Sequence, residues 1–399
     1  MFRSLILLTL LAIVLLILDP VGCESSGGGS DAPTVAAVPQ TPQDTSPVVA
    51  VAAVRELGPI ETSATILMRD CGYSAMFQGQ SVWLYGDTLL EFANADNQRM
   101  LCNSWSVTHD SDAGDGLAGF EEPLDEVGAP IPFFPLTEEE RAFNAAHAGD
   151  YCEEQPCHAR WSIWPGTMVV DEGRRLVYAF YHKIYSEPGE FNFHHVGHSI
   201  AVWRDFSKVP QRPIFGYYDK YPTLFFSEDR DGFGSAAVIV GEQVYVYGCE
   251  LLAGDVVKPC RLARVPLADI LDKQAWSYYS VQGTWTADVQ DAGMIFYGNN
   301  MMSVFYNAYI GRYMAVYSQP MDTRVVLRTA PSPEGPWSEA LEVLIAEPPV
   351  SSSGWIYDGL AHPEYSEGDG QTIYISYSRQ TGPAASEMRH VAVDLEKLN

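Results

Sequence analysis

Two aspartates, Asp70 and Asp87, stand near the ends of RDCGYSAMFQGQSVWLYGDTLL, which otherwise has the pattern of a β-hairpin. Strands disfavour Asp, so this placement points to a special role. Nine residues separate Asp70 from Gly79 and eight separate Gly79 from Asp87, so antiparallel pairing across the QGQ turn brings both carboxylates to one end. Their repulsion would raise the pKa of one, which suits a general acid beside an ionised partner. The structural alternative is an Asx turn between Asp87 and Thr88, with Asp70 paired to Arg69 or another basic group.

Aromatic and basic residues near these carboxylates would suit a sugar-binding site. Trp105 in NSWSVT and Trp164 in RWSIWPG stand beside polar or small residues rather than inside an apolar run. The apolar face of a sugar stacks on such rings. Arg160 in HARWSIWPG can bind a hydroxyl group or hold a carboxylate. The structural alternatives are tryptophans packed between sheets and an ordinary ion pair for Arg160.

Further polar residues occur nearer the C-terminus. AHPEYSEGDG contains His362 and Glu364, which we also predict to bind substrate. Asp358 in WIYDGLAHPE, and Asp288 and Asp291 in TWTADVQDAG, could face the same site. Acids in such places are more often surface or turn residues, so these three rank lower.

The segment HHVGH, with His194, His195 and His198, invites a zinc interpretation. His195 and His198 are three residues apart, and a regular strand would direct them to opposite faces. CEEQPC, from Cys152 to Cys157, has neither redox nor zinc-ribbon spacing. The chain contains no Walker loop, GxSxG elbow, HExxH motif or dinucleotide fingerprint. We therefore predict a site without metal or cofactor, and histidines that are hydrogen-bonded.

The elements that must position these residues follow a repeat. Five segments, each a Gly-containing turn and then an aromatic, β-branched strand, begin at Gly79, Gly173, Gly241, Gly311 and Gly370. The apolar segments that precede them are YSAMFQ, GTMVVDE, SAAVIV, MSVFYNAYI and HPEYSEG. Most units continue into a third strand, and helical patterns are confined to 137–148 and 266–274. The repeat predicts an all-β five-bladed β-propeller with mostly antiparallel four-stranded blades, rather than paired β-sandwiches.

A propeller would account for the two aspartates. The innermost strands of all blades converge on a central funnel, so distant parts of the sequence can face one site. A carboxylate at such a strand end borders a wet cavity instead of a packed core.

The N-terminal segment has the features of a targeting signal. Arg3 precedes an apolar run of 15 residues, Ser4 to Leu18, which is short for a membrane span. Cys23 after DPVG resembles a lipobox with Pro20 in place of an aliphatic residue. We predict a lipoprotein-type signal peptide over 1–23, a flexible linker over 24–57 and a catalytic propeller over 58–399. Ordinary cleavage nearby and an uncleaved anchor are the alternatives.

Cysteine usage and charge agree with export. With lipid on Cys23, six of the seven cysteines remain, an even number. Pairing of sequence neighbours predicts the disulfides Cys71–Cys102, Cys152–Cys157 and Cys249–Cys260, one of 15 connectivities. The 51 acidic and 24 basic residues give a formal net charge of −27. Such a surface repels phosphates and excludes nucleic acid as the expected partner.

The motif D-x-G-Y-S at Asp70 and the motif W-L-Y-G-D-T at Trp83 resemble an exported family long labelled a domain of unknown function, which includes endo-D-arabinanases. Further similar motifs are WPG at Trp164, VYVYG at Val244, LARVP at Leu262, MSVFYNAYIGRYMAVYS, RTAPSPEGPW, HPEY and IYISYS. The resemblance covers about 62–395. It implies a five-bladed propeller that hydrolyses arabinofuranosyl linkages and uses Asp70 and Asp87 as its catalytic pair. Cys71 departs from the family, where a Gly or polar residue would be unremarkable.

In that scheme one aspartate protonates the leaving oxygen, and the other activates water or attacks the anomeric carbon. A carboxyl separation of roughly 5–5.5 Å predicts retention, and roughly 6.5–9.5 Å predicts inversion. The main alternative is a non-catalytic propeller lipoprotein that binds a glycan or a partner. A lyase for uronates would need a basic site, and an esterase would need a nucleophilic serine that we do not find. We expect a monomer acting on a polysaccharide, held to a membrane only by a lipid anchor, in the envelope, periplasm or surface, or secreted.

Overall fold

The structure is a computed structural model, and its described residues all belong to the unit 35–399. It describes residue 37 and residues 46–189, 192–227, 232–249, 258–347, 356–382 and 385–398. The predicted signal peptide, Cys23 and most of the predicted linker lie outside these ranges. No helix within them is both long enough and apolar enough to cross a membrane.

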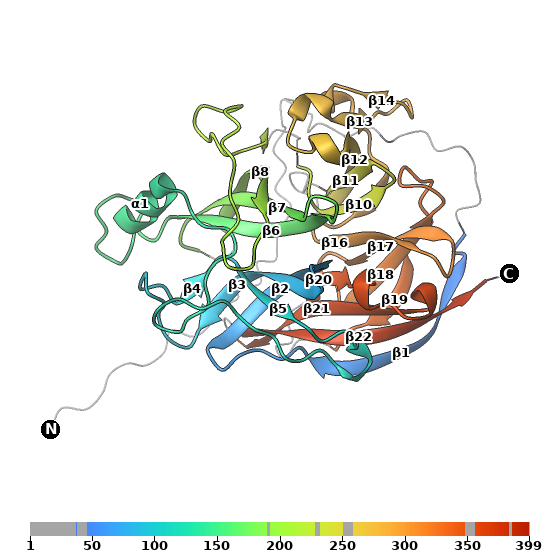
Figure 1. The fold of residues 1–399 in the computed structure, drawn as a ribbon, viewed down its shortest axis with the longest axis horizontal. Coiled ribbons are helices and arrows are strands. Elements are labelled where there is room, and N and C mark those ends of the chain that lie inside the picture. The colour runs from blue at the N-terminus through green and yellow to red at the C-terminus, as the bar shows by residue number, and fades with distance from the viewer. Residues whose placement is uncertain are drawn as a thin grey trace, which may run out of the picture. The chain divides into compact units, whose positions relative to one another are not determined.

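The strands in the described ranges form five small sheets, which we number as blades one to five (Figure 1). Blade one contains β2 (Ile66–Phe77), β3 (Gln80–Leu90), β4 (Met100–Leu101) and β5 (Ser104–Thr108). Blade two contains β6 (Arg160–Asp171), β7 (Leu176–Ser186), β8 (Phe193–Trp203) and β9 (Phe226–Ser227). Blade three contains β10 (Ala236–Val240), β11 (Gln243–Cys249), β12 (Lys258–Pro266), β13 (Ser277–Tyr279), β14 (Trp285–Thr286) and β15 (Phe296–Gly298). Blade four contains β16 (Met302–Asn307), β17 (Arg312–Ser318), β18 (Arg324–Ala330) and β19 (Leu341–Ile345). Blade five contains β20 (Ile356–Ala361), β21 (Thr372–Gly382), β22 (Ala385–Lys397) and β1 (Val49–Pro59).

The first strands of the blades form a closed ring. β2 contacts β6, β6 contacts β10, β10 contacts β16, β16 contacts β20, and β20 returns to β2. Neighbouring strands within each blade pair antiparallel. The predicted five-bladed β-propeller is therefore confirmed. Each Gly-containing segment of the repeat lies between the first and second strands of a blade, and in blade one it is a tight turn between β2 and β3.

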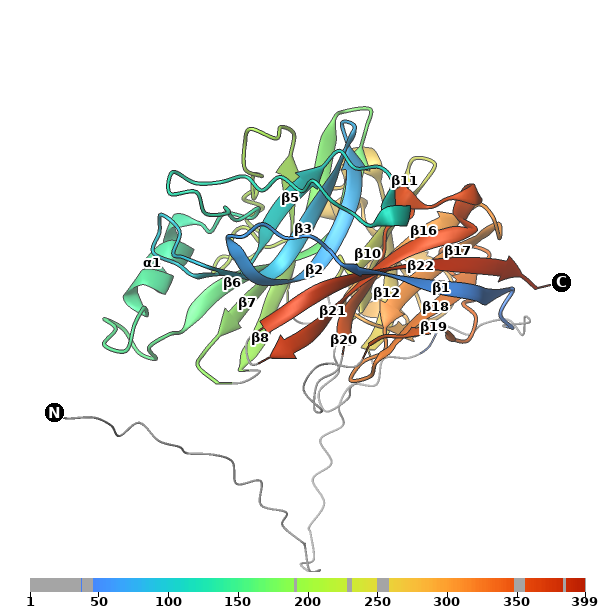
Figure 2. The same ribbon diagram turned by 90° about the horizontal axis from the view of Figure 1, so that it is seen from below.

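Blade five closes the ring with both ends of the described chain. β1 pairs antiparallel with β22, from Val49 opposite Lys397 to Pro59 opposite Arg389. Figures 1 and 2 show β1 lying along β22 at the edge of this blade. Val49 is fully buried in a core shared by blades four and five. The structure therefore places residues 49–57, predicted as linker, in the propeller.

The first strand of blade five differs from the prediction. HPEYSEG, which was expected to form it, instead contains the short 3-10 helix η5 (Pro363–Tyr365). The inner strand is β20, which includes Tyr357 and Asp358. Asp358 has a left-handed backbone, with φ of 54°. This conformation interrupts the regular alternation of side chains between the two faces of β20. The alternating pattern expected of a strand is therefore weak in this part of the sequence.

One α-helix occurs in the described ranges, α1 (Glu138–Ala146), within the predicted segment 137–148. Thr137 and Glu140 form a capping box at its start. The segment 266–274 contains the 3-10 helices η2 (Leu267–Asp269) and η3 (Lys273–Ala275) instead of an α-helix. The remaining 3-10 helices are η1 (Ala113–Asp115), η4 (Val289–Asp291) and η6 (Gly368–Gly370).

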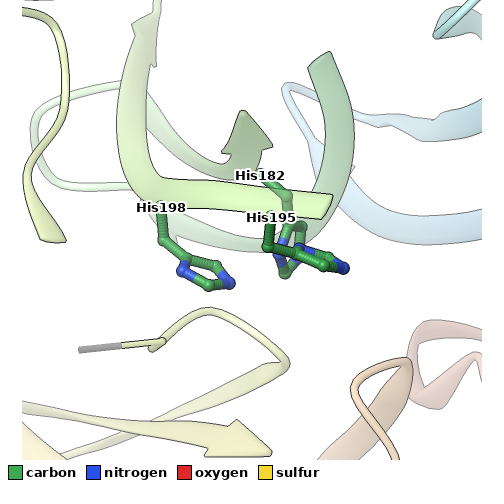
Figure 3. A group of neighbouring side chains, drawn as sticks. All are labelled: His182, His195 and His198. Atoms are coloured by element: carbon green, nitrogen blue, oxygen red, sulfur yellow. The ribbon is translucent and has the colours of Figure 1, made fainter. Parts of the chain in front are cut away.

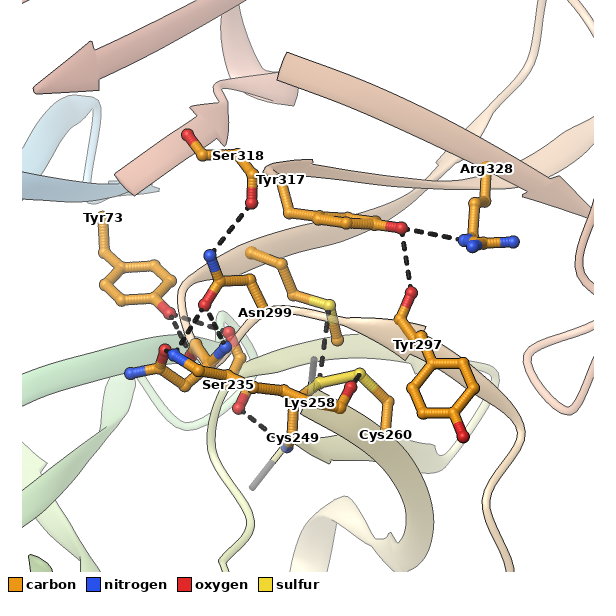
Figure 4. The surroundings of a disulfide bond; sticks show 12 residues. Tyr73, Ser235, Cys249, Lys258, Cys260, Tyr297, Asn299, Tyr317, Ser318 and Arg328 are labelled. Carbon is orange, nitrogen blue, oxygen red and sulfur yellow. Dashed lines mark hydrogen bonds between the residues drawn. A yellow bond between two sulfur atoms is a disulfide. The ribbon is translucent and has the colours of Figure 1, made fainter. Parts of the chain in front are cut away.

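Two of the three predicted disulfides form in the described part of the chain. Cys152 bonds to Cys157, and Cys249 bonds to Cys260, its direct partner across β11 and β12 (Figure 4). Disulfides of this kind are typical of extracellular or periplasmic proteins.

The predicted Cys71–Cys102 bond is wrong, because both residues are free thiols. The side chain of Cys71 packs in an apolar core with Tyr73. The sulfur of Cys102 instead accepts a hydrogen bond from Ile163 N in blade two at 3.3 Å. The two thiols therefore have different surroundings.

Candidate active site

A cavity of about 940 Å³ lies where the inner strands meet. Residues of β2, β6 and β20 line it, together with Asn300 and Met301 just before β16. Its wall continues into the connections that follow β3, α1 and β7. Residues from distant parts of the sequence therefore share one hollow, as the funnel of a propeller allows.

Asp70 borders this cavity on β2. The register between β2 and β3 shifts on both sides of Cys71, so the strand bulges beside Asp70. Gly86 on β3 makes room for the carboxylate, since a Cβ there would lie 2.5 Å from Asp70 Oδ1. The hydroxyl group of Tyr357 donates a hydrogen bond to Asp70 Oδ2 at 3.2 Å. Arg69, the alternative partner of Asp70, instead pairs with Glu122.

Asp87 on β3 lines the same cavity. Its Oδ1 atom is buried and has no hydrogen-bond partner among the described residues. Burial raises the pKa of Asp87, whereas the positive charge of Arg160 and the indole N–H of Trp164 favour its ionised form. The structure thus brings together four of the predicted site residues: Asp70, Asp87, Arg160 and Trp164.

Asp358 is a third carboxylate of the cavity, and it ranked low in the sequence. Its Oδ2 atom accepts a hydrogen bond from Cys71 N at 3.1 Å, which links blade five to blade one. Burial raises the pKa of Asp358 to about 7, although the Cys71 N–H and the charge of Lys258 oppose the shift. The signal in the sequence was an acid inside the apolar segment WIYDGLA.

The three carboxylates differ in the surroundings that set their proton affinity. The pKa of Asp70 is raised well above its usual range, first by burial and then by the charges of Asp358 and Asp87. The hydroxyl group of Tyr357 partly opposes this rise. Asp87 instead has a cation beside it. The surroundings therefore favour a proton on Asp70 over one on Asp87, the arrangement of an acid beside a base or nucleophile.

Aromatic side chains form part of the cavity wall. Trp164 lies 4.8 Å from Phe193, ring centre to ring centre, in an edge-to-face arrangement, and both line the cavity. Phe193 is 39% exposed, so it offers an apolar surface to a ligand. It lies at the start of β8, where no sequence pattern marked it. These two rings can stack on sugar faces.

Helix α1 contributes another part of the wall through Asn144 and His147. Glu140 fixes this helix to blade two: its carboxylate accepts hydrogen bonds from Lys183 and from Arg212, the latter at 2.6 and 3.0 Å. These cations lower the pKa of Glu140 to about 2 against the effect of burial. The ion pairs are almost fully buried, so they hold the wall in place.

Trp105 lies away from the cavity. It is 2% exposed and packs edge-to-face against Phe133 and Trp203 in the core between blades one and two. Trp105 is therefore packed between sheets, which was the structural alternative for this residue. Its strand β5 (Ser104–Thr108) pairs with β3 on the side away from the inner strand β2.

His362 and Glu364 also lie outside the cavity lining. His362 stacks on Trp83, and its ring nitrogens bond to Ser74 and Ser376. Glu364 accepts a hydrogen bond from the same Ser74 hydroxyl group. Both residues follow the inner strand β20, so their side chains connect blades one and five.

Three histidines of blade two gather on one side of β7 and β8 (Figure 3). They are His182, His195 and His198, and burial lowers the pKa of each. The expected opposite placement of His195 and His198 is wrong, because β8 bulges between them. The expected hydrogen bonds are also missing from several of their ring nitrogens within the described residues.

Lys258 acts through its charge both on histidines of this cluster and on Asp358. Its ammonium group donates to Asn299 Oδ1 at 2.9 Å and to Asn300 Oδ1 (Figure 4). Burial lowers the pKa of Lys258 to about 8, and the nearby Asp358 opposes the shift. Lys258 is the first residue of β12, and no sequence motif marked it.

Comparison with solved structures finds several similar proteins. A Bacteroides ovatus protein, provisionally described as a hydrolase, aligns with a TM-score of 0.54 and 14% identity over 84% of this chain and 87% of its own. A GH43_1 enzyme from Xanthomonas citri, complexed with xylotriose, gives 0.44 and 14% over 86% and 89%. An α-L-arabinofuranosidase from Podospora anserina, in complex with cellotriose, gives 0.42 and 12% over 85% and 95%. A search of curated proteins finds no match.

A family model described as "Domain of unknown function (DUF4185)" matches residues 61–386. The match begins shortly before β2 and ends within β22, so it includes all five inner strands and every carboxylate of the cavity. The chain belongs to the DUF4185 family.

Proposed function

We propose that the protein is a glycoside hydrolase that cleaves arabinofuranosyl linkages in a polysaccharide. The observation that carries the proposal is the meeting of Asp70, Asp87 and Asp358 in one cavity, with their pKa values raised to different degrees. Glycosidases typically use two carboxyl groups that flank the scissile bond, one of them protonated and the other ionised. The arabinofuranosyl specificity rests on the resemblance of the motifs at Asp70 and Trp83.

In the proposed mechanism, Asp70 is the general acid and protonates the departing glycosidic oxygen. Asp87 remains ionised beside Arg160 and either activates water or attacks the anomeric carbon. Burial, followed by the charges of Asp358 and Asp87, raises the pKa of Asp70 and so favours its protonated form. Trp164 and Phe193 would bind sugar rings, and Arg160 would bind a hydroxyl group or position Asp87.

A neutral sugar polymer suits the charge of the site better than an acidic one. Four carboxylates line the cavity against two arginines, and the whole chain carries a formal net charge of −27. A substrate rich in uronates would be repelled by the carboxylates of the cavity and by the negative net charge of the whole chain. We extend the proposal to an exported protein that is anchored by lipid at Cys23, with 24–48 as its tether.

The test measures new reducing ends after incubation with D-arabinan, L-arabinan and other plant glycans. We expect activity on an arabinan, and a loss of about 10³-fold or more in kcat for Asp70→Asn and Asp87→Asn, because each removes a group that transfers a proton or bonds to carbon. Asp288→Asn is the matched control: Asp288 is exposed in blade three and only caps η4 (Val289–Asp291). It should retain wild-type activity.

Equal activity of wild type and Asp87→Asn on every arabinan would exclude this mechanism. Circular dichroism and thermal unfolding must show that the variants remain folded, since a structural aspartate could also abolish activity. Binding of arabinan without any cleavage by wild type would instead favour the non-catalytic propeller.

A further inference from the structure

His182, His195 and His198 have the arrangement of a metal-binding group. Each offers one ring nitrogen, and these nitrogens all lie within 4.8 Å of one another. His182 is on β7 and the other two are on β8, so rigid paired strands carry all three. Figure 3 shows the rings on one side of the strand pair. His182 and His195 also line the cavity described above.

The backbone brings the three rings together through one irregularity. His182 is the direct cross-strand partner of His198. Farther along, Lys183 pairs with Gly197 while Ile184 pairs with His195, so one extra residue bulges from β8. That residue shifts His195 to the face that already carries His198. The bulge therefore converts a spacing of three, which would separate the rings, into a cluster.

Gly197 makes this bulge compatible with the next strand. A Cβ at this position would lie 2.5 Å from the carbonyl oxygen of Phe226 and 2.7 Å from Leu224 Cδ1. β9 pairs with β8 through Gly197 and His198. The histidine cluster is thus part of a closely packed sheet and not a chance meeting of mobile surface side chains.

The ring nitrogens lack the partners that buried histidines normally have. Both nitrogens of His182, and Nδ1 of His195 and of His198, are buried without a hydrogen bond among the described residues. His182 is only 3% exposed. His362 provides the contrast within this chain, because Ser74 and Ser376 satisfy both of its nitrogens. Buried polar atoms are nearly always paired, so the unpaired nitrogens point to a ligand.

We propose that His182, His195 and His198 bind one divalent transition-metal ion of the zinc class, with an open coordination position toward the cavity. Imidazole suits zinc, copper, iron and nickel, whereas calcium and magnesium require oxygen ligands. The described group contains histidines only. Three protein ligands with a free position are the pattern of metal sites that take up water or a substrate oxygen.

Binding requires a small inward movement of the rings. Nitrogens bound to one tetrahedral zinc ion, at about 2.0–2.1 Å from it, lie about 3.3 Å apart. Because the nitrogens here all lie within 4.8 Å of one another, each separation exceeds that value by at most about 1.5 Å, which rotation of the imidazoles about their side-chain bonds can supply. The charges of Lys258 and Arg261 act on the cluster, so coordination bonds, and not an acidic surrounding, must hold the ion.

The test measures metal binding directly and does not depend on glycosidase activity. The full chain is produced without a histidine tag, treated with chelator, and titrated with Zn²⁺ by calorimetry and with Co²⁺ by visible absorption. We expect one equivalent of each ion per chain and the visible bands of nitrogen-bound Co²⁺. His195→Gln and His198→Gln should each weaken Zn²⁺ binding by about 100-fold or more, because one of three ligands is lost.

His194→Gln is the matched control, because His194 is an exposed neighbour on the same strand outside the cluster. It should bind Zn²⁺ as wild type does, and Ca²⁺ should not compete. The proposal fails if wild type takes up no stoichiometric Zn²⁺ or Co²⁺, or if His194→Gln weakens binding as much as His195→Gln. If a cluster variant does not fold, the wild-type protein alone still tests the proposal. The proposal is overturned if wild type lacks either the one-to-one stoichiometry or the visible bands of nitrogen-bound Co²⁺.

Discussion

At the scale of single residues, one hydroxyl group adjusts the proton affinity of the central carboxylate. Tyr357 donates to Asp70 Oδ2, and this hydrogen bond lowers a pKa that burial and two neighbouring carboxylates raise. Asp70 must be protonated to act as the proposed acid. Its deprotonation would then define the alkaline limb of the activity profile.

Tyr357→Phe should move this alkaline limb to higher pH. The substitution removes a donor that stabilises the carboxylate, so the pKa of Asp70 rises further and the acid stays protonated longer. Profiles of kcat/KM against pH for wild type and variant provide the measurement. Tyr306→Phe is the control, because Tyr306 is 53% exposed and does not line the cavity. A shift to lower pH, or an equal shift in Tyr306→Phe, would contradict the assignment.

At the scale of elements, a buried ion cluster attaches helix α1 to blade two. Glu140 accepts from Lys183 and Arg212, whose side chains are only 5% and 3% exposed. The same helix supplies Asn144 and His147 to the cavity wall. The position of this wall therefore depends on one carboxylate.

Glu140→Gln should lower the free energy of unfolding by about 3 kcal/mol, because it leaves two buried cations without their counter-charge. Urea unfolding at neutral pH measures this loss. The exposed Glu138→Gln on the same helix is the control and should change stability by less than about 0.5 kcal/mol. Near-equal losses in the two variants would argue against the ion cluster as the attachment.

The same cluster has a defined pH dependence. The pKa of Glu140 is lowered from 4.5 to about 2 in the folded protein, so its stabilisation is complete above pH 4.5 and is lost as the pH falls toward 2. Glu140→Gln should therefore lose less stability than wild type across this interval.

At the scale of the whole molecule, β1 closes the propeller by joining blade five from the opposite end of the chain. Val49 opposes Lys397 in this pairing and is fully buried in the core of blades four and five. Blade five would otherwise end in an exposed edge strand at β22.

Val49→Ala should destabilise the protein by about 2 kcal/mol, because it removes buried methyl groups and leaves a cavity. Val54→Ala on the same strand is the control: Val54 is 39% exposed, and its loss should cost less than about 0.5 kcal/mol. Chemical denaturation of both variants tests the comparison. Equal stability of the two would mean that β1 does not contribute to the core.

Local patterns in the sequence predicted most of the fold. Gly-containing turns before aromatic strands mark each blade, because the turn and the strand period depend only on neighbouring residues. The helical pattern over 137–148 is likewise local, and α1 begins within it at a capping box formed by Thr137 and Glu140. The two observed disulfides join cysteines that are 5 and 11 residues apart.

The site could be predicted only in part. Asp70 and Asp87 belong to one hairpin, so their meeting in the cavity followed from its register. Asp358 lies on an inner strand whose left-handed residue hides the strand pattern. Trp105 and Trp164 have similar neighbours in the sequence, yet one is core and the other lines the cavity, because their strands occupy different positions in their blades.

The sequence by itself therefore determined the repeat, the propeller and the first pair of carboxylates, since each depends on short-range periodicity. The tertiary structure decided which groups join that pair. Closure of the ring brings Asp358 next to Cys71, and a bulge in β8 brings His195 beside His198. Both results arise from contacts between strands, and the proton affinities of the carboxylates arise from burial by other blades.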